Sequence, residues 1–91
     1  MKVLQTPTFS KAVKKLHANQ KKDLDAAVRA IIADPDLGEA KVGDLAGVLV
    51  QKFKMVKQPM LLAYSFEARV ITLTLLALGP HENFYRDLKR L

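Results

Sequence analysis

The residues best suited to chemistry follow the longest apolar run of the chain. His81 and Tyr85 stand four residues apart, directly after Gly79-Pro80. Histidine exchanges protons near neutral pH, and a spacing of four puts two side chains on the same side of a helix. Three basic residues follow: Arg86, Lys89 and Arg90. The pattern predicts a buried strand that delivers a histidine and a tyrosine to an exposed edge beside positive charge.

Composition narrows the chemistry. The chain has 91 residues, which suits one domain over residues 1–91 with a modest core. It contains no cysteine, so a disulfide scaffold, a thiolate zinc site and thiol catalysis are excluded. Two histidines without clustered carboxylates argue against a metal site, and no cofactor is implied. The apolar run from Val70 to Leu78 is too short to span a bilayer, so we expect a cytoplasmic protein without a membrane partner.

The net charge of +6 is unevenly distributed. Residues 1–22 hold six lysines and no acid, whereas residues 23–48 hold six acids against Arg29 and Lys41. Residues 49–61 add three lysines. A basic surface of this kind attracts polyanions, either nucleic acid or an acidic protein; the alternative is a solvated face that keeps a small protein soluble.

Two helices are predicted after a short strand over residues 2–5. Thr6-Pro7 is typical of a helix start, and apolar residues at helical spacing carry this helix to about His17. Asn19 is a plausible cap for a second, amphipathic helix, which Asp34-Pro35 ends. The two helices form a hairpin with lysines near or on its outer side.

A period of two follows a predicted loop over residues 35–47. Lys52 and Lys54 point to one face of the next strand. The opposite face takes three apolar residues: Leu49, Phe53 and Met55. Gln58-Pro59 is predicted to be the turn before the next strand, over residues 60–66.

The last strand is predicted over residues 70–79 and is apolar on both faces. One face takes Ile71, Leu73, Leu75 and Ala77, and the other takes Val70, Leu76 and Leu78. It should therefore be central in a three-stranded antiparallel meander. The order β-α-α-β-β-β-α predicts the α+β class, with a small curved antiparallel sheet packed on a helical hairpin.

The chain resembles the RelE/ParE superfamily of bacterial toxins from type II toxin–antitoxin systems. The likeness covers essentially the whole chain and is carried by GDLAGVLVQKFKMVKQPMLLAYSF and LALGPHENFYRDLKR. It implies a small basic RelE-like fold and neutralisation by a cognate antitoxin. It also implies one of two activities: cleavage of messenger RNA on the ribosome, as in the RelE branch, or poisoning of DNA gyrase, as in the ParE branch.

The resemblance also assigns residues. RelE-type toxins carry two lysines on alternate positions of the second strand, which Lys52 and Lys54 match. They carry a basic residue or histidine after the last strand and then an aromatic residue, which His81 and Tyr85 match. Many carry an arginine early on the third strand, where this chain has Leu61.

These residues suit metal-independent RNA cleavage, in which the 2′-OH attacks the adjacent phosphate. His81 would serve as base or acid, the two strand lysines would neutralise the phosphate, and Tyr85 would stack on a base. Three further residues are candidates for substrate binding: Lys57, Arg86 and Glu82. Either Arg86 or Lys57 would replace the missing arginine, whereas Glu82 is either a second base or an acid that stabilises the following helix.

Each assignment has an alternative. His81 and Tyr85 would otherwise only pack the last helix on the sheet, and Lys52 and Lys54 would be solvated charges or antitoxin contacts. A gyrase poison needs no active site of its own, and a decayed member would cause no growth arrest. A ribosome-dependent mRNA endonuclease is the function that we expect.

Overall fold

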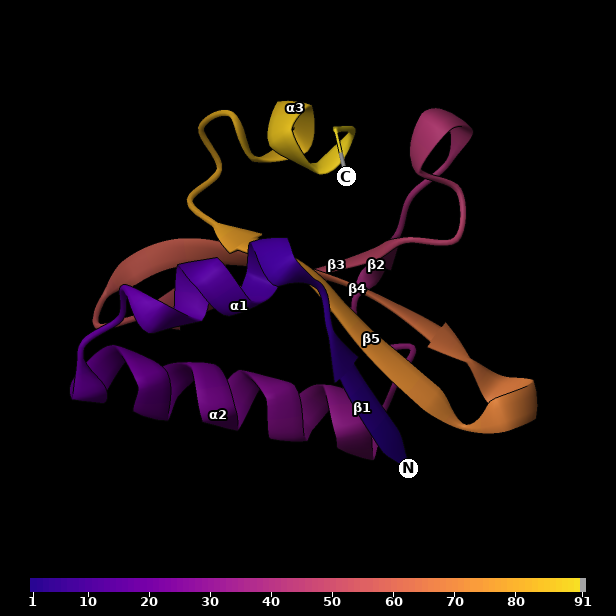
Figure 1. The fold of residues 1–91 in the computed structure, drawn as a ribbon, viewed down its shortest axis with the longest axis horizontal. Helices are drawn as coiled ribbons and strands as arrows, with labels where there is room; N and C mark the ends of the chain where they lie inside the picture. The colour runs from indigo at the N-terminus through magenta and orange to yellow at the C-terminus, as the bar shows by residue number, and fades with distance from the viewer. Residues whose placement is uncertain (91) are drawn as a thin grey trace.

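The computed structural model describes residues 1–90, which form a five-stranded sheet with helices on both faces (Figure 1). The elements in chain order are β1 (Lys2–Gln5), α1 (Pro7–Lys14), α2 (Ala18–Ala33), β2 (Glu39–Ala40), the 3-10 turn η1 (Gly43–Leu45), β3 (Leu49–Met55), β4 (Gln58–Glu67), the 3-10 turn η2 (Ala68–Val70), β5 (Thr72–Gly79) and α3 (Phe84–Leu88). The predicted α+β class and the helical hairpin packed on a curved sheet are confirmed.

The strand order in the sheet is β1-β5-β4-β3-β2. Strands β3, β4 and β5 form the predicted antiparallel meander, and β5 is an interior strand. β1 adds to β5 in the parallel direction, from Lys2 opposite Thr72 to Gln5 opposite Leu75. The two-residue strand β2 pairs with β3 inside the segment predicted to be a loop, because two residues are too few to show a period.

The helical hairpin starts as the sequence predicts and turns earlier. Thr6 Oγ1 accepts a hydrogen bond from the Phe9 amide at 3.1 Å, so it caps α1 before Pro7. α1 ends at Lys14, not near His17, and α2 begins directly after His17 rather than after Asn19. The His17 amide donates to Gln20 Oε1 at 2.7 Å, which satisfies one free amide at this start. No helix among residues 1–90 has the length and apolar content needed to cross a membrane.

Two apolar cores lie on opposite faces of the sheet. The first core lies under α1 and α2 and contains Phe9, Leu24, Ile31, Met55, Met60, Leu62, Tyr64, Leu73 and Leu75. The second core lies under α3 and contains Val50, Leu61, Ala63, Ala77, Phe84 and Leu88. Every one of these residues is at least nine-tenths buried.

A bulge in β5 changes which face its residues reach. Leu75 lies opposite Tyr64 and Ala77 lies opposite Ala63, so Leu76 is an extra residue on β5. Ala77 therefore belongs to the second core, and its predicted place on the face of Leu73 and Leu75 is wrong. Residues 70 and 71 precede the strand and are exposed, so the strand starts two residues later than predicted.

The turn between β3 and β4 lies at Val56-Lys57, not at Gln58-Pro59. Met55 pairs with Gln58, which leaves a two-residue turn with φ values of 48° at Val56 and 69° at Lys57. Pro59 fits inside β4 because β5 ends opposite Leu61, so β4 has a partner on only one side at Pro59.

Candidate functional site

The β3–β4 pairing puts the two strand lysines on the face that carries the second core. Lys52 lies opposite Leu61, and Lys54 lies opposite Pro59. Val50, two residues before Lys52 on the same face, is buried beneath α3. Lys52 and Lys54 are themselves exposed on this face.

A hollow of about 160 Å³ joins Lys52 to His81. Its walls are Lys52, Pro59, Met60, Leu61 and His81. His81 reaches it because Gly79, the last residue of β5, lies opposite Leu61 on the neighbouring strand. The structure thus brings together a histidine and a lysine that are 29 positions apart in the sequence.

His81 is held against Tyr85. Their ring centroids are 5.8 Å apart, and the rings meet edge to face at 76°. Tyr85 packs in the same manner on Phe84, with centroids 5.4 Å apart. Phe84 and Leu88 anchor α3 in the second core, and the Phe84 amide donates to the His81 carbonyl at 3.2 Å. The position of the imidazole therefore depends on the docking of this short helix.

Lys41 is a member of the site that sequence reasoning missed. Its Nζ lies 5.1 Å from the centroid of the Tyr85 ring and 3.4 Å from Glu39 Oε1. Hydrogen bonding to the Tyr85 side chain, followed by the charges of Tyr85 and then Glu39, raises the pKa of Lys41 above its ordinary value. In the sequence, Lys41 is notable only as a lone lysine within an acidic segment. No spacing pattern connects it with Tyr85.

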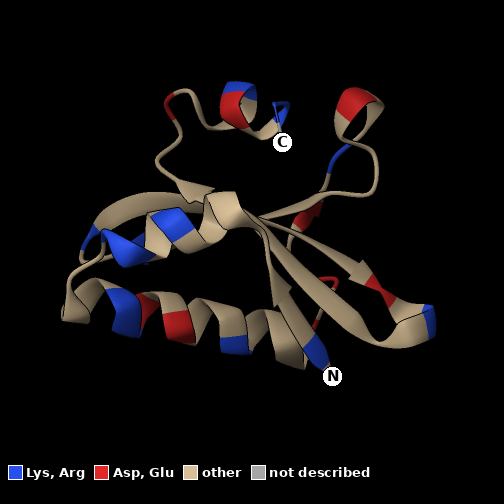
Figure 2. Cartoon of the chain, in the orientation of Figure 1, with Lys and Arg blue, Asp and Glu red and all other residues tan. Residues whose placement is uncertain are grey.

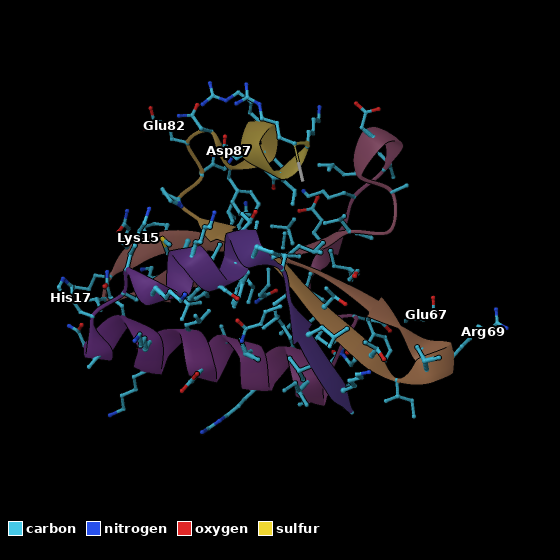
Figure 3. All side chains as sticks on the ribbon, in the orientation of Figure 1. Lys15, His17, Glu67, Arg69, Glu82 and Asp87 are labelled. Atoms are coloured by element: carbon cyan, nitrogen blue, oxygen red, sulfur yellow. The ribbon has the colours of Figure 1, made fainter. Side chains whose placement is uncertain are left out.

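None of the three candidate substrate-binding residues lines the hollow between Lys52 and His81. Lys57 is exposed at the β3–β4 turn. Arg86 is exposed on α3, with its Nε 3.7 Å from Asp87 Oδ1. Glu82 lines a different hollow, of about 190 Å³, which includes Thr8 and Ala12 of α1. Figure 3 shows Glu82 on the loop before α3, projecting outward.

Basic residues concentrate at one end of the molecule, where α1 ends and α2 begins (Figure 2). The group comprises Lys11, Lys14, Lys15, Lys21 and Lys22, all exposed. The β3–β4 turn reaches the same end, because the Val56 amide donates to Asp23 Oδ2 at 2.7 Å. Lys57 of that turn therefore extends the positive surface from the helical hairpin toward Lys54. No three metal-binding side chains converge within residues 1–90.

Solved structures of bacterial toxins share this fold. A double mutant of the E. coli toxin RelE in the free state superposes with a TM-score of 0.75 at 14% identity, over 98% of this chain and 94% of that one. The YoeB/ParE toxin from Agrobacterium tumefaciens gives 0.71 at 18% identity, over 89% and 99% of the two chains. A chain of the RelBE2 toxin–antitoxin complex from Mycobacterium tuberculosis gives 0.66 at 20% identity, over 88% and 96%.

The family follows from the sequence. Residues 3–89 match the family described as the ParE-like toxin of type II bacterial toxin–antitoxin systems. The chain belongs to this family, within the RelE/ParE superfamily, as its resemblance predicted. No curated protein sequence matches the chain.

Proposed function

We propose that this toxin is a metal-independent endoribonuclease that cuts messenger RNA on the ribosome and thereby halts translation. The observation that carries the proposal is the hollow shared by Lys52 and His81, with Lys54 exposed on the same strand face. It offers a proton-transfer group and cations at one place, as cleavage next to a 2′-OH requires.

The reaction assigns a role to each group. Neutral His81 accepts the proton of the 2′-OH while this oxygen attacks the adjacent phosphorus. The bond from phosphorus to the 5′ oxygen breaks, and that oxygen takes a proton from water, leaving a 2′,3′-cyclic phosphate and a 5′-OH. Lys52 and Lys54 neutralise the charge that grows on the phosphate oxygens. Tyr85 orients the imidazole, and its solvent-facing part is available to stack on a base.

The lysines around the turn suit a longer RNA contact. The exposed positive surface runs from Lys54 through Lys57 to the end of the helical hairpin. Lysines that neutralise successive phosphates release counterions, which supports RNA binding outside the hollow.

A cognate antitoxin is the second partner. The similar chains include toxins solved in complex with their antitoxins, the E. coli RelBE complex and the Mycobacterium tuberculosis RelBE2 complex. An antitoxin that covers the basic surface would neutralise this chain by charge complementarity and by occupying the RNA-binding side.

Inducible expression in bacteria, followed by pulse labelling of protein and DNA synthesis, tests the proposal. We expect translation to stop first with the wild type and to continue with His81→Ala. The matched control is His17→Ala, which removes the other histidine at the start of α2 and should remain toxic. Toxicity of His81→Ala equal to the wild type would contradict the role of His81.

Gyrase poisoning is the second candidate, and Leu61 favours it. Leu61 occupies the position that carries an arginine in many RelE-type toxins, and it is 3% exposed, with its side chain in the second core. A gyrase poison would stop DNA synthesis before protein synthesis, and His81→Ala would leave its toxicity intact.

A further inference from the structure

The turn between β3 and β4 has an unfavourable sequence for its backbone. A two-residue turn with positive φ at both positions favours Asn-Gly, because these residues adopt the left-handed region readily. Here the positions hold Val56 at φ 48° and Lys57 at φ 69°. A β-branched side chain at positive φ is strained, so this conformation persists only where its surroundings hold it.

Asp23 supplies such a hold. Its Oδ2 accepts a hydrogen bond from the Val56 amide at 2.7 Å, between positions 33 apart in the sequence. The next residue, Leu24, is 4% exposed in the first core, so this turn of α2 is fixed on the sheet. A carboxylate that accepts from an amide is among the stronger hydrogen bonds in proteins.

The turn decides where the strand lysines point. With the turn at Val56-Lys57, Lys52 lies opposite Leu61 and beside the hollow that His81 lines. If the pairing register of β3 with β4 shifted by one residue, Lys52 would lie opposite Leu62, whose side chain lies in the first core under the helices. The sequence also offers Gln58-Pro59 as a competing turn, which would move the pairing further along β4.

We propose that Asp23 is a positioning residue for the lysine pair: by holding the strained turn, it keeps Lys52 and Lys54 on the face of His81. This role rests on the proposed ribonuclease function. It also explains why an acid stands amid the basic end of the molecule, where its charge alone would weaken attraction to RNA.

The salt dependence of RNA binding tests the role. The logarithm of the binding constant for single-stranded RNA changes with the logarithm of salt concentration by about 0.7 per neutralised phosphate. We expect Asp23→Ala to make this slope shallower, by about 0.7 for each lysine lost, and to slow cleavage by up to about a hundredfold, as a misplacement of about 1 Å can do. A smaller folded fraction would lower the amount of active protein without changing the slope.

Three variants complete the design. Asp25→Ala removes the same charge two residues further along α2, from an exposed carboxylate that forms no hydrogen bond with the turn within residues 1–90. It should leave the slope equal to that of the wild type or make it steeper, whereas Asp23→Ala should make it shallower. Asp23→Asn retains an oxygen acceptor and should restore the wild-type slope, as should Asp23→Ala combined with Val56→Gly, which relieves the backbone strain.

The outcomes distinguish a failure of the Asp23 role from a failure of the proposed ribonuclease function. A wild-type protein that neither binds nor cuts RNA overturns the proposed function, and the role of Asp23 in it falls as well. A functional wild type whose slope is unchanged by Asp23→Ala overturns the role of Asp23 alone. Amide exchange gives a direct check, because the Val56 amide should exchange faster in Asp23→Ala and remain protected in Asp23→Asn.

Discussion

The imidazole of His81 meets the ring of Tyr85 edge to face, with centroids 5.8 Å apart and planes at 76°. The ammonium of Lys41 lies over the ring of Tyr85, 5.1 Å from its centroid. Phe84 and Leu88 hold α3, and therefore Tyr85, on the sheet. A single aromatic ring thus links the loop after β2 to the histidine after β5.

Substitutions of Tyr85 test this link. Tyr85→Ala removes the ring contact with His81, and such contacts are worth about 0.5–1.5 kcal/mol. We expect RNA cleavage to fall about tenfold, since 1.4 kcal/mol corresponds to a factor of ten. Tyr85→Phe keeps the ring and should retain most activity. It should also lower the pKa of Lys41 toward 10.5, because hydrogen bonding to the Tyr85 side chain is the first cause of its rise. Cleavage kinetics and an NMR titration of the lysine side chains measure the two effects.

Tyr64 links the sheet to the loop after α2. Its hydroxyl donates to the Pro35 carbonyl at 2.7 Å and accepts from the Gly38 amide at 2.8 Å. Tyr64→Phe leaves both backbone groups without this partner, so we expect the free energy of unfolding to fall by about 1–3 kcal/mol. Chemical denaturation measures the change. An unchanged free energy of unfolding would mean that water replaces the hydroxyl.

The same residue predicts sensitivity to alkali. Burial raises the pKa of Tyr64 above 10.0, so the folded state favours the neutral phenol. The unfolded chain loses this proton first as pH rises, so the stabilisation is complete below pH 10 and declines above it. We expect the decline with pH to be smaller in Tyr64→Phe. Thermal unfolding of both proteins between pH 8 and 11 provides the comparison.

Gly38 has no room for a side chain. A Cβ at this position would lie 2.9 Å from both Cε1 and the hydroxyl oxygen of Tyr64, and 3.1 Å from the carbonyl carbon of Val50. Gly38→Ala should therefore destabilise the fold by about 1–3 kcal/mol. Gly79→Ala is the matched control, because its Cβ would meet only Phe84 Cδ1 at an ordinary 3.6 Å. Equal destabilisation by the two changes would contradict this account.

The strand lysines should account for a defined share of the salt dependence. Removal of Lys52 and Lys54 together should make the RNA-binding slope shallower by about 1.4, at about 0.7 per phosphate. Lys2→Ala with Arg69→Ala removes the same charge from residues outside the candidate site and should leave the slope unchanged. Figure 3 shows Arg69 at the end of the molecule opposite Lys15. Equal slopes for the two double variants would place RNA elsewhere.

The sequence predicts those parts of the fold whose signals are local. Thr6 and Pro7 mark the start of α1, and Asp34-Pro35 marks the end of α2, as the structure confirms. The predicted position of the β3–β4 turn was wrong because Gln58-Pro59 is a more favourable turn sequence than Val56-Lys57. The structure selects the poorer pair because Asp23, on another element, holds it. The bulge at Leu76 has no local signal, so the predicted faces are wrong for both Ala77 and Leu78.

The residues of the candidate site were also predictable only where their signals are local. His81 and Tyr85 were recognisable by type and spacing, and Lys52 and Lys54 by alternation along one strand. Their meeting in one hollow depends on the pairing of β4 with β5, which no spacing expresses. Lys41 was missed because its contact with Tyr85 crosses from the loop after β2 to α3. Contacts of this kind depend on the tertiary structure and have no signal in the local sequence.

The parallel pairing of β1 with β5 joins the two ends of the chain in one sheet. Because β5 lies between β1 and β4, the sheet lacks this interior strand until synthesis has passed Gly79. His81 and Tyr85 emerge later still. An unfinished chain therefore carries Lys52 and Lys54 without their partners across the hollow. Under the proposed function, a chain that stops before His81 carries no complete site, so cleavage starts only after this segment has been synthesised.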